Sequence, residues 1–313
     1  MPLGSWGSSE ESIRQTIIDF FWQKVPVLVV RMAVRRPAVA GMFYPGTKTA
    51  LLKSIEEAFR RAGVQSIPRP ASDGPRKIVG LLCPHAGYMY SGHVAAAAYA
   101  KMAEDGSPQT FVVIGPNHTG LGAPVSVFER GSWETPLGLV QIDEDLAGAI
   151  IDACPVAEPD QIGHLAEHSV EVQLPFLQAI YGEARMVPVV MLDQTMSASR
   201  ELGAAIAKAC TALGRDCVII ASSDLTHYEP AETAERKDRA ALDAILKLDE
   251  EFLYKVISAM SISMCGYGPT AAMLVAAKAL GARTAELVRY SHSGETTGDY
   301  GAVVGYASAV VRR

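Results

Sequence analysis

The sequence predicts a single α/β domain in which a mostly parallel central sheet carries helices on both faces. Three observations support this prediction. Short apolar runs recur along the chain, helix-like segments separate them, and 49% of the 313 residues are hydrophobic while 20% are charged. Strands that are apolar throughout are typical of sheets covered on both faces, and the intervening helices supply the crossovers that parallel strands need. The same composition excludes a disordered chain, which needs low hydrophobicity and high charge.

The first half of the domain begins with a helix and then alternates between strands and helices. Leu51, Ile55 and Phe59 recur at helical spacing, and Asp143 provides an acidic cap for a later helix. Short apolar runs that end at proline or glycine predict the strands. The predicted elements are helices over 47–62, 92–103 and 143–153, strands over 77–83, 110–114, 124–128 and 139–142, and a hairpin or flap over 133–138.

The second half continues the same alternation to the end of the chain. Pro269 fits the first turn of a helix, where a missing N–H costs nothing. We find no internal repeat and no internal linker, which favours one domain. The predicted elements are helices over 169–180, 197–213, 233–247, 251–260 and 269–280, and strands over 186–192, 217–221, 286–290 and 302–311.

Residues 1–31 differ from the rest of the chain. A Gly/Ser-rich start is followed by an apolar stretch without clean periodicity, and Arg14, Asp19 and Lys24 interrupt that stretch. It therefore predicts neither a membrane span nor a signal peptide. We predict a disordered or mis-assigned N-terminal extension over 1–31, upstream of a start at Met32, and one domain over 32–313. The alternative is an amphipathic arm that binds a partner.

Charge and cysteine usage narrow the functional classes. The net charge of −6 argues against a general electrostatic footprint for nucleic acid. The five cysteines have no regular spacing and no CxxC motif, which predicts a reducing compartment, the cytoplasm. A Walker A loop, a GxGxxG turn, an HExxH motif and a GxSxG elbow are all absent from the sequence, which weakens nucleotide-binding and serine-hydrolase interpretations.

Polar side chains follow three of the predicted strands at the point where each strand ends. His85 follows the first strand and His118 the second, while Asp224 and His227 follow a third. Ligands of open α/β sheets bind at the carboxyl edge, where such residues meet. The alternatives are loop histidines and, for Asp224, a helix cap with a surface histidine. Their shared position favours a site.

Cys265 and His168 are two further candidates. Cys265 lies just before Gly266 and Gly268 at the start of a helix, whose N-terminal amides stabilise a thiolate. The other four cysteines are interpreted as buried structural thiols. His168 begins a predicted helix beside Glu167 and Glu171, which favours an acid–base or supporting role. The alternative there is helix capping with a solvated acidic face.

As a set, these segments resemble the Memo family, known in microbes as the AmmeMemoRadiSam system protein B group. The resemblance covers residues 33–311 in order. The opening and closing segments of the domain contribute to it as well. The motifs are RPAVAGMFYP (36–45), HAGY (85–88), SG (91–92), GPNH (115–118), EHSVE (167–171), SSDLTH (222–227), CG (265–266) and VVGYA (303–307).

The resemblance implies a fold like that of LigB-like class III extradiol dioxygenases and a metal pocket of two histidines and a cysteine. Carried over, His85, His118 and Cys265 would be metal ligands, Asp224 and His227 would line the pocket, and His168 would neighbour it. Cysteine replaces the glutamate ligand of the dioxygenases, so ring cleavage of a catechol is not implied. Iron(II) is the first expectation for the metal, with copper or zinc as alternatives.

Several functions remain open at this point. The first is a metal-dependent oxidoreductase in which His168 or His227 moves protons, Asp224 orients His227, and Tyr88 and the 133–138 flap shape the mouth. The second is a non-catalytic adaptor that binds a metal or a peptide. For the adaptor hypothesis, the family name implies AMMECR-type and radical-SAM proteins as partners. The third is acyl transfer with Cys265 as the nucleophile, and the fourth is a zinc hydrolase. Both would use the same residues in other roles.

Overall fold

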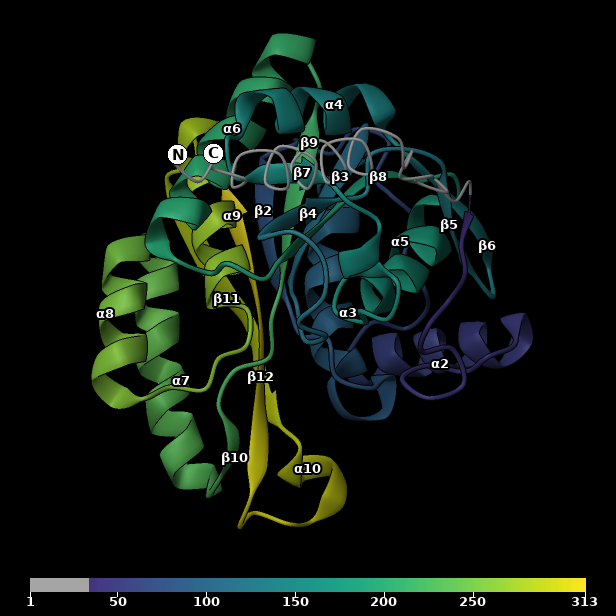
Figure 1. Cartoon of the computed structure of the whole chain (residues 1–313). Coiled ribbons are helices and arrows are strands. Elements are labelled where there is room, and N and C mark those ends of the chain that lie inside the picture. The colour runs from purple at the N-terminus through teal and green to yellow at the C-terminus, as the bar shows by residue number, and fades with distance from the viewer. Residues whose placement is uncertain (1–33) are drawn as a thin grey trace, which may run out of the picture. The chain divides into compact units, whose positions relative to one another are not determined.

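Five parallel strands form the centre of a mixed sheet in the computed structural model, which describes residues 34–313 (Figure 1). The predicted extension over 1–31 lies outside the described residues. Within them, β6, β8, β3, β9 and β2 lie side by side and parallel, and antiparallel strands extend both edges. The strand order is β1 (Val34–Arg35), β5 (Ser132–Thr135), β6 (Gly138–Ile142), β8 (Arg185–Met191), β3 (Thr110–Pro116), β9 (Cys217–Ser222), β2 (Ile78–Cys83), β12 (Val303–Arg312) and β10 (His227–Glu229).

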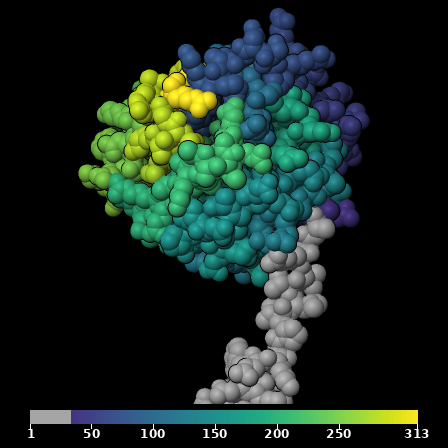
Figure 2. All heavy atoms as spheres, turned by 90° about the horizontal axis from the view of Figure 1, so that it is seen from above, coloured from purple at the N-terminus to yellow at the C-terminus, as the bar shows by residue number. Residues whose placement is uncertain are grey.

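Three further strands pair outside that row. β11 (Thr284–His292) pairs with β12 in an antiparallel manner, and β4 (Val125–Val127) pairs with both β8 and β7 (Ala157–Pro159). The C-terminal strand ends at the surface beside the segment that precedes β2, where Arg313 Nη2 donates to the carbonyl of Arg76 at 2.9 Å (Figure 2). None of the described helices is long and apolar enough to span a membrane.

The register of the central strands brings their carboxyl ends to one edge. Pro116 of β3 is paired with Met191 of β8, and Cys83 of β2 is paired with Ser222 of β9. Every residue of β2, β3 and β9 is buried, as strands covered on both faces require. Residues that directly follow these strands are therefore close together in space.

Helices cover both faces of the sheet, as predicted (Figure 1). One group contains α2 (Lys48–Arg61), α3 (Tyr88–Glu104) and α5 (Leu174–Tyr181), which pack on one another. The other contains α4 (Glu144–Ala153), α6 (Met196–Leu213), α8 (Glu250–Met260) and α9 (Tyr267–Ala279), while α7 (Ala231–Leu246) packs on α8 and β11. A Cβ at Gly203 would lie 2.5 Å from the Ala272 carbonyl oxygen, so glycine allows α6 and α9 to approach closely. The α/β fold class is confirmed.

The helix predicted over 169–180 is divided into two pieces. A 3₁₀ turn, η2 (Glu171–Gln173), precedes α5, and a separate turn η1 (Ile162–His164) lies upstream. Pro175 lies at the start of α5, where it cannot donate a backbone hydrogen bond to the preceding turn. The shorter helix leaves His168 in a loop instead of on a helix. A last short helix, α10 (Gly294–Thr297), connects β11 to β12.

The segment over 133–138 forms a hairpin in the sheet, and its interpretation as a flap is wrong. Trp133 of β5 is paired with Val140 of β6 and is fully buried. Its ring packs edge-on against Phe128 and His164. Tyr88 is also buried, and its hydroxyl donates to the Val172 carbonyl at 2.8 Å. Neither side chain is free to shape a pocket mouth, because both are fixed in the core.

Candidate metal centre

Three histidines meet at the carboxyl edge of the sheet. His85 follows β2, His118 follows β3, and His168 lies in the loop before η2. One ring nitrogen from each lies within 4.8 Å of those of the other two. The ring of His118 stacks on that of His168 at 4.6 Å, and His85 stands edge-on to both at 5.3 Å. The ring of Phe43 packs against that of His168, with the two centroids 4.6 Å apart.

Cys265 contacts this histidine cluster (His85, His118 and His168) from one side. Its Sγ lies 3.2 Å from His85 Nε2 and 3.3 Å from the backbone N of Asp224. The ligand set implied by the resemblance was His85, His118 and Cys265, with His168 as a neighbour. The structure groups His168 with His85 and His118, and Cys265 lies beside this group in contact with His85. The three histidines could therefore hold a cation, with His168 in the place that the resemblance gave to Cys265.

The tautomer of His85 follows from its hydrogen bonds. Ser222 Oγ donates to the Ser169 carbonyl at 2.6 Å and accepts from Gln173 Nε2 at 2.8 Å. Its single hydrogen is thereby used, so His85 Nδ1, 3.0 Å away, must be the donor to that oxygen. His85 Nε2 then carries the lone pair, and this is the atom that faces Cys265. The ring presents a metal-ligand atom toward the cluster.

Glu167 performs the same task for His118, and the sequence analysis missed it. Its Oε1 lies 2.9 Å from His118 Nδ1, which leaves the lone pair on Nε2. The carboxylate is fully buried and also accepts from the backbone N–H groups of His118, His168 and Ser169. Burial alone would raise the pKa of Glu167, but the bonds from His118 lower it to about 2. A charged carboxylate therefore orients this imidazole.

Burial keeps two of the histidines neutral. It lowers the pKa of His85 well below its ordinary value, and the nearby His168 and His118 rings lower it further. Burial also lowers the pKa of His168 to about 4. Neutral imidazole is the form that binds a metal, because its lone pair is free. These two rings thus offer nitrogen ligands at neutral pH without first losing protons.

The other two predicted site residues are held by different contacts from those expected. Asp224 Oδ1 accepts from the backbone N of His85 at 2.8 Å and of Ala86 at 3.3 Å. His227 instead directs Nδ1 to the Ser263 carbonyl at 2.9 Å. The expected Asp224–His227 hydrogen bond does not occur, because the carboxylate is used to fix the turn after β2.

Asp224 should make the stability of the metal-free protein depend on pH. Burial raises its pKa to about 6 from the ordinary 3.8, so the folded state binds this proton more tightly than the unfolded state. Stability should therefore decrease as pH rises from about 4 to about 6, by an amount on the order of 2–3 kcal/mol. Asp224→Asn keeps an oxygen for both N–H donors and should lose this slope. Urea unfolding across the window checks it, and parallel curves for the two proteins would contradict it.

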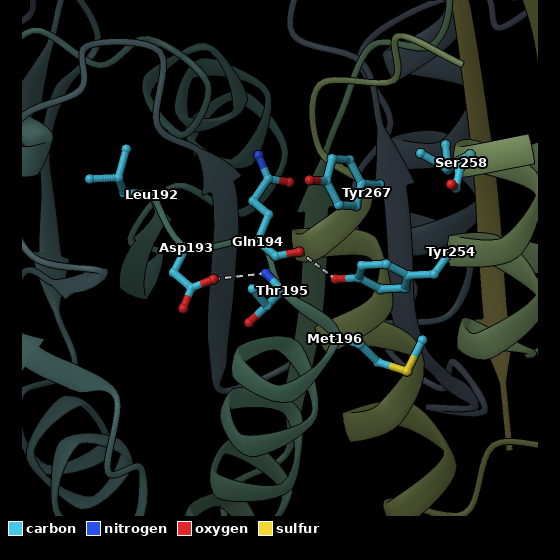
Figure 3. Close-up of a pocket in the computed structure, with 9 residues that line it drawn as sticks. Leu192, Asp193, Gln194, Thr195, Met196, Tyr254, Ser258 and Tyr267 are labelled. Carbon is cyan, nitrogen blue, oxygen red and sulfur yellow. Dashed lines mark hydrogen bonds between the residues drawn. The ribbon is translucent and has the colours of Figure 1, made fainter. Parts of the chain in front are cut away.

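The loop that carries Cys265 is held by Gln194 from the β8–α6 connection. Gln194 Nε2 donates to the Cys265 carbonyl at 2.9 Å, and Gln194 Oε1 accepts from the Gly268 N–H at 2.9 Å. Figure 3 shows Gln194 beside Tyr267 and Tyr254, in the wall of a cavity of about 530 Å³. The Tyr254 hydroxyl donates to the Gln194 carbonyl at 2.7 Å. The position of the thiol thus depends on a residue that no motif indicated.

A buried arginine fixes the loop that carries Glu167 and His168. Arg35 of β1 donates from Nε to the His164 carbonyl at 2.7 Å and from Nη2 to the Glu167 carbonyl at 2.8 Å. It also pairs with buried Glu171 and lies 4.0 Å from the centroid of the Trp133 ring. The solvated acidic face considered for Glu167 and Glu171 is wrong, since both carboxylates are completely buried. The strongest sequence signal for them was two acids beside a histidine in an otherwise apolar segment.

Comparisons with known proteins find related sequences over most of the chain and one similar fold. Residues 35–310 match the sequence model of the family described as Memo-like protein. A MEMO1 family protein of Methanopyrus kandleri is 49% identical over 281 residues, which cover 89% of this chain and 99% of that protein. One from Methanothermobacter thermautotrophicus is 48% identical over 275 residues, covering 88% and 99%. The crystal structure of an uncharacterized Escherichia coli K12 protein matches with a TM-score of 0.52 at 14% identity, over 75% of this chain and 100% of that one, which shows a shared fold.

Proposed function

The chain belongs to the Memo family, and from this membership together with its histidine cluster we propose that it is a metal-dependent oxidoreductase. The observation that carries the proposal is the cluster of three imidazoles, two of which are oriented by Ser222 and Glu167, with a thiol beside them. Imidazole and thiolate together suit iron, copper and zinc, and iron(II) is our first choice. Bound iron or copper would supply one-electron chemistry at the edge of the sheet.

The protein's own groups would orient the ligands and move a proton. Glu167 and Ser222 orient His118 and His85 through their Nδ1 atoms, and His85 is neutral because burial lowers its pKa. His227 donates through Nδ1 to Ser263, which leaves Nε2 as the acceptor atom. We propose that His227 accepts a proton from the substrate, with Asp224 fixing the turn that carries His85.

The proposal predicts which metal copurifies and which side chains bind it. Protein purified anaerobically should contain near-stoichiometric iron or copper by elemental mass spectrometry, because the lone pairs are already directed into the cluster. His85→Ala should lose it. Comparison of Cys265→Ser with His168→Ala identifies the third ligand, since only the ligand variant should lose most of the metal. His93→Ala, a buried histidine outside the cluster, is the matched control.

The other outcomes of this experiment are equally informative. Zinc that is lost with His85 would favour the hydrolase interpretation over redox chemistry. Absence of metal from the wild-type protein, together with failed reconstitution, would overturn the proposal. Iron or copper that survives in His85→Ala, Cys265→Ser and His168→Ala alike would show that the ion binds elsewhere.

A second candidate is a binding module in which the site recognises a partner. The segments next to the site residues expose large apolar side chains, namely Met89 of α3, Leu121, Leu165 and Tyr228 of β10, the last of which is 78% exposed. Contiguous exposed apolar side chains mark interaction surfaces, and we propose these four residues for that role. The partners proposed for this function are the AMMECR-type and radical-SAM proteins. Oxygen consumption by the metal-loaded protein with added substrates separates this candidate from the first.

A further inference from the structure

Two cysteines meet where α6 ends and β9 begins. Cys210 lies in the last turn of α6, and Cys217 is the first residue of β9. Their Sγ atoms are 3.0 Å apart, closer than two sulfur atoms in ordinary van der Waals contact. Both side chains are buried, but the turn between them, from Thr211 to Gly214, is exposed.

We propose that Cys210 and Cys217 are free thiols under reducing conditions and form a disulfide bond on oxidation, which cross-links the end of α6 to the start of β9. A disulfide needs a sulfur–sulfur distance of about 2.03–2.05 Å, so each sulfur has to move by only about half an ångström. The backbone between the two cysteines already forms a tight turn that brings them together. Gly214 takes the left-handed conformation at φ 60°, and the N–H of Arg215 donates to the Cys210 carbonyl at 2.9 Å.

The other three thiols have different surroundings. Cys83 lies in β2 beside Tyr99, and Cys154 caps the end of α4. Cys265 contacts His85 and Asp224 in the candidate metal centre. Within residues 34–313, Cys210 and Cys217 are the only thiols in contact with one another. The proposal therefore names one pair and excludes the others.

The bond can form by exchange with a small disulfide such as oxidised glutathione. One cysteine thiolate attacks the small disulfide, which releases one small thiol and leaves a mixed disulfide on the protein. The second cysteine thiolate then displaces the other small thiol. The protein loses two S–H bonds and gains one S–S bond, and the two small thiols carry away the electrons and the protons. The exposed turn gives the reagent access when the last turn of α6 opens.

Differential alkylation with intact mass measurement tests the proposal. The full chain is equilibrated with oxidised glutathione at mildly alkaline pH, since contact with Cys210 and burial raise the pKa of Cys217. It is then unfolded, alkylated and weighed beside a reduced sample. The reduced chain should take up five alkyl groups, and the oxidised chain should take up two fewer and contain a Cys210–Cys217 cross-linked peptide. Five alkyl groups after oxidation, or a cross-link between other cysteines, would overturn the proposal.

Matched variants make the result specific. Cys210→Ser should take up four alkyl groups in the reduced sample and show no internal cross-link after oxidation. Cys154→Ser should also take up four when reduced, but two fewer when oxidised, because it retains the pair. The oxidised wild type should unfold at a higher temperature than the reduced wild type, and Cys210→Ser should show no such difference. A difference of the same size in Cys210→Ser would count against the bond as its cause.

Discussion

Replacing Glu167 with glutamine should weaken metal binding by about 10- to 100-fold, which is the usual cost of losing a carboxylate that orients a ligand histidine. The carboxylate accepts from His118 Nδ1 and from three backbone N–H groups. A glutamine side chain keeps only one oxygen, so its amide group would point a hydrogen at one of these donors. His118 would lose its charged partner and its fixed orientation. Competition titration against a chromophoric chelator measures the change in affinity.

Glu171→Gln is the matched control for this prediction. Glu171 is equally buried and also accepts from several donors, namely the backbone of Ala38 and Val39, the Tyr44 hydroxyl and Arg35. It does not touch His118. Both variants should be destabilised, but Glu171→Gln should retain most of the metal affinity when compared at a temperature where both are folded. An equal loss in the two variants would mean that Glu167 acts only through the stability of the loop.

Arg35→Met should lower the free energy of unfolding by about 3–5 kcal/mol, because it leaves the Glu171 carboxylate buried without its cation. Arg35 and Glu171 are both almost completely inaccessible to solvent. The substitution also removes donors from the His164 and Glu167 carbonyls and a cation from the face of Trp133. Urea unfolding of the metal-free protein measures the loss without a contribution from ligand binding.

The neighbouring residue provides a surface control. Arg36 forms an ion pair with Glu134, but its side chain is 79% exposed, so Arg36→Met should change stability by less than about 1 kcal/mol. The double variant Arg35→Met with Glu171→Gln should lose less stability than the sum of the single changes, since it removes both charges of the pair. Additive losses would show that the ion pair itself contributes little and that the backbone contacts of Arg35 dominate.

The sequence predicted the central strands and the edge where the site lies. Apolar runs ending before His85, His118 and Asp224 were sufficient, because parallel strands in register bring their carboxyl ends together. It allowed the segment around Trp133 to be an exposed flap, because Trp133 comes shortly before a Pro-Leu-Gly turn. In the structure the segment is a hairpin and Trp133 is fully buried. The sequence also predicted one helix over 169–180, where Pro175 instead starts a new one. Local sequence patterns predict helices and strands well, but they do not predict which loops pack against one another.

The sequence by itself determined the family, the α/β class and a set of polar residues at one sheet edge. Only the tertiary structure decided that His168 joins His85 and His118, and that Glu167 orients His118. It also decided that Gln194 fixes the Cys265 loop and that Cys210 meets Cys217. The physical reason is that the spacing of apolar residues within a short segment is enough to predict a helix or a strand and its buried face. Contacts between side chains from separate loops depend instead on how the whole backbone packs, so they cannot be predicted from any one short segment.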